Sequence, residues 1–221
     1  MKKLYTSLNL KKTLMLKALG VDYIEPIASF KEPEIALPNR LNELNELIKN
    51  CYLCELSKGR KNTVFGEGNL DANIMFIGEA PGASEDNSAR PFMGRTGELL
   101  TKMIENVLDI KRDEVYITNI LKCQPLKGKA PTANEILTCK PYLQKQIQIV
   151  KPKLIVTLGD MAYSYLTNDN TPITQTRGHI FDMQEYKVLP TFHPSYLLRN
   201  PSAKKEAFAD MLKVKEFLKT I

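Results

Sequence analysis

The sequence predicts an α/β fold: a three-layer α/β/α sandwich around a central, mostly parallel, four-stranded sheet. Two observations support this fold. Short apolar segments alternate with longer segments whose apolar residues recur every three or four positions, which is the pattern of strands connected by helices. One segment, residues 153–159, is almost wholly apolar, as expected for a strand covered on both faces. With 221 residues, 43% of them hydrophobic, the chain can form one domain with a substantial core.

Residues 1–40 are predicted to form an N-terminal extension, and residues 41–221 the folded domain. Residues 8–19 fit one amphipathic helix with lysines on its polar face. Residues 21–40 contain three prolines and little periodicity, which is typical of a tether. We interpret the extension as a tail with no function of its own, and a partner-binding helix is the alternative.

The first half of the domain is predicted to contain two helices and two strands. Residues 41–51 form a helix that leads into a pair of cysteines. Residues 71–82 begin as a short apolar strand and continue into a loop of glycine and proline. The apolar spacing of residues 95–110 predicts a helix, and residues 114–123 form the second strand, in which β-branched residues favour extended backbone.

The second half repeats this alternation. Residues 133–150 are predicted to be helical, although Pro141 is expected to break or kink the helix because proline has no backbone N–H. Residues 153–159 and 186–195 form the third and fourth strands, and residues 204–221 close the chain as an amphipathic helix. Because ligands of such folds bind at the carboxyl ends of the strands, the polar motifs that follow three of these strands are expected to share one crevice.

The first of these motifs is Gly-Glu-Ala-Pro-Gly at residues 78–82, directly after the first strand. A tight loop of this composition points backbone N–H groups outward and can hold a planar polar ligand or an anion. Phe92 follows shortly afterwards, between Pro91 and Met93. It is either a surface on which a nucleic-acid base stacks or a core residue.

The other two motifs centre on single polar residues. Asn119 ends the second strand, and its side chain offers one acceptor and two donors in one plane, which matches the O4 and N3–H edge of uracil but not the amine of cytosine. Closing a turn is the alternative role. His193 ends the fourth strand and could donate a hydrogen bond to charge that develops on a leaving group. A structural role is the alternative for His193, and it is the role predicted for His179.

The chain has four cysteines, Cys51, Cys54, Cys123 and Cys139, in a C-x2-C pair and a C-x15-C pair separated by 68 residues. This spacing predicts one soft-metal site with four thiolate ligands, and either a [4Fe–4S] cluster or a structural zinc fits it. Four buried apolar thiols are the alternative. Thiols used as metal ligands favour a reducing compartment, so we expect a cytoplasmic protein. No apolar run is long enough to cross a membrane, and the N-terminus lacks the pattern of a secretory signal.

Together these motifs resemble the uracil-DNA glycosylase superfamily, and specifically its family 4, the iron–sulfur enzymes. The resemblance covers residues 42–221 and rests on residues 78–100, residues 118–125, the cysteine frame and the segment His-Pro-Ser-Tyr-Leu-Leu at residues 193–198. It implies a monofunctional glycosylase of DNA base-excision repair that carries a [4Fe–4S] cluster on the four cysteines. Such an enzyme flips uracil out of DNA and hydrolyses its N-glycosidic bond, leaving an abasic site.

The resemblance also implies roles for individual residues. Glu79 and Ala80 contribute backbone to the uracil pocket, and Glu79 is among the expected catalytic residues. Phe92 stacks on the flipped base. Asn119 recognises the edge of uracil, and His193 hydrogen-bonds uracil O2 as negative charge develops on the leaving base.

Further roles follow from the same resemblance. Glu85 is expected to narrow the pocket against the methyl group of thymine. One of Tyr196, Leu197 and Leu198 is expected to act as a wedge that enters the DNA.

One position departs from the best-known branch of the superfamily, which has an aspartate where this chain has Ala80. No loop carboxylate is therefore evident as a general base, although Glu79 or Asp86 could assist. We infer a dissociative mechanism, in which leaving-group stabilisation precedes the attack of water.

The expected partner is uracil-containing DNA, single- or double-stranded, bound by a monomer away from any membrane. The net charge of +6 is compatible with a polyanion. Lys122, Lys127, Lys129 and Arg199 are candidates for contacts with the DNA backbone. Two competing hypotheses are a non-catalytic nucleic-acid-binding module and an electron-transfer protein that uses its cluster for redox chemistry.

Overall fold

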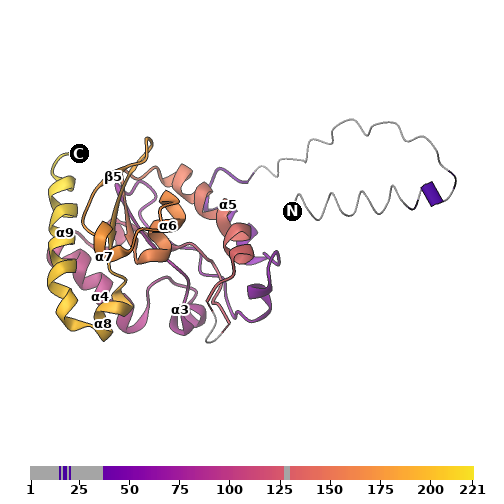
Figure 1. Ribbon diagram of the computed structural model, residues 1–221, viewed down its shortest axis with the longest axis horizontal. Coiled ribbons are helices and arrows are strands. Elements are labelled where there is room, and N and C mark those ends of the chain that lie inside the picture. Colours follow the sequence, from indigo (N-terminus) through magenta and orange to yellow (C-terminus); the bar gives the residue numbers. More distant parts are fainter. Residues whose placement is uncertain (1–14, 16, 19, 21–36, 127–129) are drawn as a thin grey trace. The chain divides into compact units, whose positions relative to one another are not determined.

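The computed structural model describes residues 37–126 and 130–221, together with residues 15, 17, 18 and 20. The predicted helix at residues 8–19 and the predicted tether therefore lie largely outside the described residues. Leu37–Ile221 form one compact unit, and Figure 1 labels several of its elements. In the part of the chain that the structure describes, no helix is both long and apolar enough to span a membrane.

The α/β class is confirmed, but the sheet formed by the described residues has six strands where the sequence predicts four. The strands are β1 (Glu67–Gly68), β2 (Ile74–Gly78), β3 (Tyr116–Asn119), β4 (Leu154–Leu158), β5 (Phe181–Asp182) and β6 (Lys187–Thr191). The central four run in the order β3-β2-β4-β6, pair in parallel and fall within the four predicted segments. Strands β1 and β5 add antiparallel edges and are each two residues long, too short for a hydrophobic period to appear.

Helices and helical turns connect the strands. The α-helices are α2 (Leu41–Lys49), α3 (Ala83–Ser88), α4 (Gly94–Met103), α5 (Ala133–Val150), α6 (Asp160–Thr167), α7 (Ile173–Thr176), α8 (Pro194–Arg199) and α9 (Lys204–Leu218). The remaining helical segments, in 3-10 or π geometry, are η1 (Glu55–Lys58), η2 (Ile104–Leu108), η3 (Arg112–Glu114) and η4 (Pro201–Ala203).

Helix α5 continues through Pro141 and is not broken there. The carbonyl that Pro141 leaves without its intrahelical donor belongs to Leu137, which lies on the exposed side of the helix at 63% exposure. A capping box formed by Thr132 and Glu135 also fixes the start of the helix.

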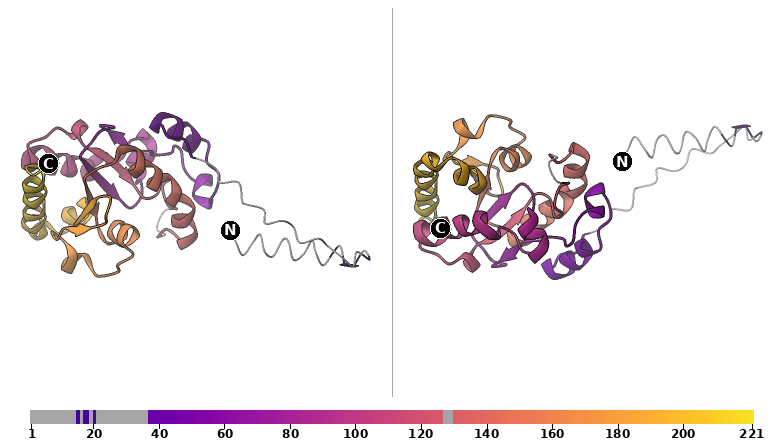
Figure 2. Two further views of the ribbon diagram at one scale, coloured as in Figure 1. Left: turned by 90° about the horizontal axis from the view of Figure 1, so that it is seen from above. Right: turned by 90° about the horizontal axis from the view of Figure 1, so that it is seen from below.

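Alternate residues of the central strands face two separate hydrophobic cores. Ile77 and Ile155 pack on one face with residues of α2, α5 and α6. Phe76 and Val156 pack on the other face with residues of α4 and α9. Figure 2 shows α5 and α9 on opposite sides of the sheet. Both faces are covered, which explains why the strand at β4 is apolar at almost every position.

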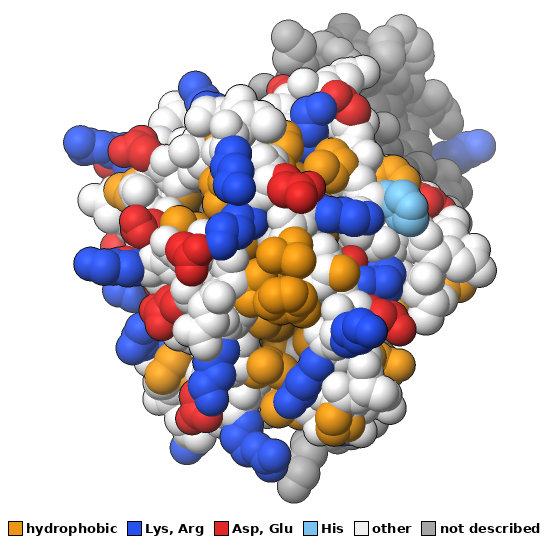
Figure 3. Space-filling view, turned by 90° about the vertical axis from the view of Figure 1, so that its left-hand side faces the viewer, with side chains coloured by type: hydrophobic (Ala, Val, Ile, Leu, Met, Phe, Trp, Pro, Cys, Tyr) orange, Lys and Arg blue, Asp and Glu red, His pale blue; other side chains and the backbone are white. Residues whose placement is uncertain are grey.

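The outer surface of α9 carries exposed apolar side chains, among them Phe208 and Leu212. Figure 3 shows this side of the molecule, where apolar side chains lie among many Lys and Arg residues. Acidic side chains lie among the basic ones on this face, so the net charge of the chain does not by itself locate a DNA-binding surface.

Candidate active site

A pocket of about 170 Å³ lies beyond the carboxyl ends of β2, β3 and β6. Its lining combines the motifs that follow these three strands: Ala80, Gly82, Glu85, Phe92, Thr96, Asn119, His193 and Ser195. The crevice expected from the sequence is thus present. Glu79 does not line this pocket but lies in an adjoining cleft of about 560 Å³, which shares several of the same wall residues.

Asn119, the last residue of β3, is 2% exposed and lines the pocket. Among the residues that the structure describes, its buried side-chain oxygen Oδ1 has no hydrogen-bond partner. An unpaired buried acceptor costs free energy unless a ligand supplies a donor. The amide fits here because Gly78 lacks a side chain: a β-carbon on Gly78 would lie 2.4 Å from Asn119 Oδ1.

Phe92 forms an aromatic wall of the same pocket and is 5% exposed. Its centroid lies 5.7 Å from that of the His193 ring. The side chain also packs in the core between the sheet and α4, which bears out the core alternative for Phe92, while base stacking stays a prediction. The backbone of Phe92 has a φ of 51°, in the left-handed region that residues other than glycine seldom adopt.

His193 is the N-cap of α8, and its ring orientation is fixed from within that turn. The backbone N–H of Ser195 donates to His193 Nδ1 at 3.1 Å, and Ser195 Oγ lies 2.7 Å from the same nitrogen. Because a backbone N–H can only donate, Nδ1 is the acceptor and the ring proton lies on Nε2.

The His193 imidazole is neutral at physiological pH. Burial, assisted by the positive charge of Arg199, lowers the pKa of His193 to about 4. The ring therefore presents a neutral Nε2–H donor. The contact between Ser195 and His193 was not predicted from the sequence; the available signal was a hydroxyl two positions after a strand-end histidine, where a helix begins.

Glu85 is buried and ties together the two loops that build the pocket. One carboxylate oxygen accepts the N–H of Gly82 at 3.0 Å, and the other accepts the N–H of Met93 at 3.1 Å. Glu85 lines the pocket, as expected, and also holds the glycine loop and the phenylalanine loop at a fixed separation.

The two carboxylates considered as aids to water attack lie in different settings. Asp86 is buried, and its oxygens accept the backbone N–H groups of Lys61 and Asn62 at 3.0–3.2 Å. Asp86 therefore holds a neighbouring loop. Glu79 is half-buried at the adjoining cleft, and burial raises the pKa of its carboxyl group.

The four cysteines line a second pocket: Cys51, Cys54, Cys123 and Cys139. They come from the segment after α2, the loop after β3, and α5. Arg60 Nη1 donates to the sulfur of Cys123 at 3.1 Å, and the hydroxyl of Tyr142 to the sulfur of Cys51 at 3.6 Å. Within residues 37–126 and 130–221, no group of three or more His, Cys, Asp or Glu has the geometry for a single metal ion. The shared thiol pocket, with donors directed at two sulfurs, fits a soft-metal group bound by thiolates.

Comparison with known proteins identifies the family. The sequence model of the family described as the uracil DNA glycosylase superfamily matches residues 65–214. The chain belongs to the uracil-DNA glycosylase superfamily.

Similar proteins identify the family within this superfamily. The type-4 uracil-DNA glycosylase of Saccharolobus solfataricus is 43% identical over 188 residues, covering 81% of this chain and 87% of that protein. The type-4 enzyme of Thermotoga maritima is 44% identical over 180 residues, covering 80% and 93%. That of Archaeoglobus fulgidus is 36% identical over 184 residues, covering 80% and 92%. These matches confirm the family-4 resemblance drawn from the sequence.

The three wedge candidates of this superfamily member differ in exposure. Tyr196 is 38% exposed, lines the adjoining cleft and stacks on Phe192, with 4.9 Å between the ring centroids. Leu198 is half-buried. Leu197 is 1% exposed and packs in the core with residues of α9. Tyr196 is therefore the most accessible of the three candidates, and the wedge itself stays a prediction.

The basic residues predicted to contact the DNA backbone also differ in exposure. Arg199 is exposed and lines the cleft. Lys127 and Lys129 lie outside the described residues. The prediction for Lys122 is wrong, because its side chain is 1% exposed. Its ammonium donates instead to Thr118 Oγ1 at 2.7 Å and to the backbone oxygen of Asn119 at 2.6 Å.

Proposed function

We propose that the protein is a monofunctional uracil-DNA glycosylase of base-excision repair. It flips uracil out of DNA, hydrolyses the N-glycosidic bond and leaves free uracil and an abasic site. The observation that carries this proposal is the buried Asn119 oxygen, without a hydrogen-bond partner in the described part of the chain, in a pocket walled by Phe92 and His193. The names of the type-4 relatives support the same activity.

Base recognition follows from the chemistry of Asn119. The N3–H of uracil donates to Asn119 Oδ1, and the side-chain NH2 group donates to uracil O4. Cytosine offers an acceptor at N3 and an amine at C4, so both hydrogen bonds would be lost and polar groups left unpaired. Phe92 stacks on the base, and the backbone of Glu79 and Ala80 completes the pocket. Binding of the extrahelical base offsets the cost of flipping it, about a few kcal/mol.

Glu85 supports the exclusion of thymine. Its carboxylate joins the loops that carry Gly82 and Met93, and this link sets how far the pocket can widen. The added methyl group of thymine requires such widening. We therefore assign selectivity against thymine to Glu85 acting through both loops.

His193 supports the departure of the base. As the bond between sugar and base breaks, negative charge accumulates on the uracil ring, including O2. The neutral Nε2–H of His193 donates a hydrogen bond to this oxygen and stabilises its negative charge without a positively charged side chain in the pocket. Water then attacks the cationic sugar. Glu79, at the cleft beside the pocket, is the carboxylate placed to assist that step.

The four cysteines would hold a [4Fe–4S] cluster, since four thiols line one pocket. When bound, the cluster supplies a soft-metal crosslink between the segment after α2, the loop after β3, and α5. Glycosidic hydrolysis moves no electrons between redox centres, so we assign the cysteine site a structural role.

The remaining assignments concern the substrate. We propose that residues 41–221 are the catalytic domain, that residues 1–40 are an extension outside it, and that one chain suffices for activity. Tyr196 is the proposed wedge, and Arg199 the proposed contact with the DNA backbone.

The test is base release from an oligonucleotide with a single uracil, detected as strand breakage after alkali, beside a matched thymine oligonucleotide. Wild-type protein should break the uracil strand alone. Asn119→Ala and His193→Ala should lose base release while keeping affinity for DNA that contains an abasic site. Unchanged function in both variants would favour a non-catalytic DNA-binding module, and a reversible redox couple without base release would favour electron transfer.

A further inference from the structure

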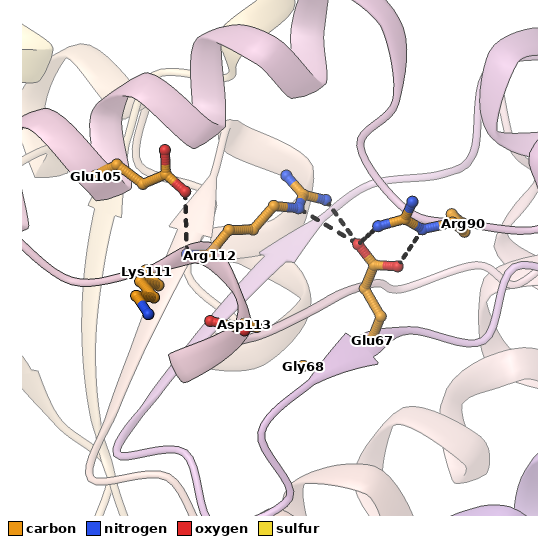
Figure 4. Close-up of a pocket in the computed structure, with 7 residues that line it drawn as sticks. All are labelled: Glu67, Gly68, Arg90, Glu105, Lys111, Arg112 and Asp113. Atoms are coloured by element: carbon orange, nitrogen blue, oxygen red, sulfur yellow. Dashed lines mark hydrogen bonds and ion pairs between the residues drawn. The ribbon is translucent and has the colours of Figure 1, made fainter.

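A network of charged residues lies behind the wall of the pocket that carries Phe92. Glu67, on the edge strand β1, accepts hydrogen bonds from two arginines, as Figure 4 shows. Arg90 Nε lies 2.7 Å from Glu67 Oε2, and Arg112 Nη2 lies 3.1 Å from Glu67 Oε1. Partial burial raises the pKa of Glu67, but the hydrogen bonds and charges of both arginines bring it below its usual value.

The two arginines differ in what else they contact. The Arg90 side chain is 56% exposed, whereas that of Arg112 is 17% exposed. Arg112 Nη2 also donates to the backbone oxygens of Pro91, at 2.8 Å, and Phe92, at 3.3 Å. Its Nη1 donates to Thr101 Oγ1 on α4 at 3.0 Å. One planar guanidinium therefore joins the edge strand, helix α4 and the backbone of the loop that presents Phe92.

That loop has a backbone that needs support. Phe92 adopts a φ of 51°, which a residue with a side chain holds only where the surroundings fix it. Its carbonyl packs against α4 at Gly97, where a β-carbon would lie 1.7 Å from the Phe92 oxygen. The absence of a side chain at Gly97 permits this close approach. Arg112 then donates hydrogen bonds to the backbone oxygens of Pro91 and Phe92.

We infer that Arg112 is a positioning residue for uracil binding: it fixes the Phe92 ring as a preformed stacking surface, and Glu67 fixes Arg112. This inference deepens the proposed function and rests on it. A ring held in place before the substrate arrives loses less conformational freedom when the base binds. Arg112 acts through Phe92 and contacts neither the base nor the reacting atoms.

Arg90 provides a matched control, because it pairs with the same carboxylate but makes no hydrogen bond to the loop carbonyls in the described structure. We would compare Arg112→Gln and Arg90→Gln in inhibition by free uracil, in KM and kcat for a uracil oligonucleotide, and in affinity for abasic-site DNA. For Arg112→Gln we expect KM and the inhibition constant of uracil to rise about tenfold, with abasic-site affinity unchanged. Arg90→Gln should change each by less than about twofold.

A double-mutant cycle separates positioning from general loss of stability. In a Phe92→Ala background, Arg112→Gln should have no further effect on the inhibition constant of uracil, since the ring on which it acts is gone. Equal effects of Arg112→Gln with and without Phe92, or no effect in either, would overturn the inference. If Arg112→Gln does not fold, Arg112→Lys undergoes the same cycle under the same criterion. Absence of base release by the wild type would instead refute the proposed function.

Discussion

Substitution of His193 by Ala tests the chemical step. The variant removes a neutral Nε2–H donor whose tautomer is set by the Ser195 backbone N–H at 3.1 Å. Removal of one preorganised donor to a developing anion costs about 10²–10³-fold in kcat, or about 2.7–4 kcal/mol. Because the imidazole is neutral, we expect a loss near the lower end, about 10²-fold, as hydrogen bonds from charged donors are the stronger ones.

Single-turnover release of uracil, with enzyme in excess, measures this loss without a contribution from product release. Affinity for abasic-site DNA serves as the control and should stay unchanged. A decrease of less than about fivefold in the single-turnover rate would refute the argument, because it would mean that the donor makes little contribution in the transition state.

The pH profile tests the same account. Because burial lowers the pKa of His193 to about 4, the rate should show no inflection near pH 6.5, and an inflection caused by this residue should lie near pH 4. The folded-state pKa lies below the unfolded value, so His193 favours the folded state fully above about pH 6.5, and this contribution is lost as pH falls toward 4. A rate that rises as pH falls through 6.5 would show that the imidazolium form is active.

Three further predictions address other parts of the structure. Lys122→Met removes a hydrogen bond to the backbone of Asn119, the residue proposed to recognise uracil, so affinity for free uracil should fall by about tenfold. The exposed control Lys205→Met should leave that affinity unchanged, and equal affinities of the two variants would contradict the prediction. Cys139→Ser should lower iron content and the melting temperature together, and full iron loading in the variant would exclude Cys139 as a ligand. Tyr196→Ala should reduce activity on duplex DNA more than on single-stranded DNA, because only in a duplex does the flipped base leave a gap in the base stack that a wedge fills. An equal reduction on both substrates would exclude Tyr196 as the wedge.

Local sequence patterns were sufficient for the features that depend on neighbouring residues. The four parallel strands are apolar runs bounded by polar loops, and their carboxyl ends bring Asn119 and His193 to the pocket as the topology requires. The edge strands β1 and β5 were missed because two residues cannot show alternation. The pairing of β1 also depends on β3, which lies far from it in the sequence, whereas β5 pairs with β6, the next strand along the chain.

Long-range contacts explain the other differences. Lys122 appears in the sequence as an exposed basic residue beside a cysteine, but the fold buries it against the carbonyl of Asn119. Leu197 belongs to a motif associated with DNA entry, yet its position on α8 turns it into the core. Arg112 lies 20 residues from Phe92 in the sequence, and only the packing of η3 against the phenylalanine loop brings them together.

We propose that this pocket selects uracil and releases it from DNA. The most direct measurement is the yield of free base from three duplexes that differ only in carrying uracil, cytosine or thymine at one position. The account predicts about one free uracil per uracil site and no release from the other two duplexes, because each alters the edge or the methyl position that the pocket recognises. Iron-loaded protein that binds uracil-containing DNA but releases no uracil would contradict it.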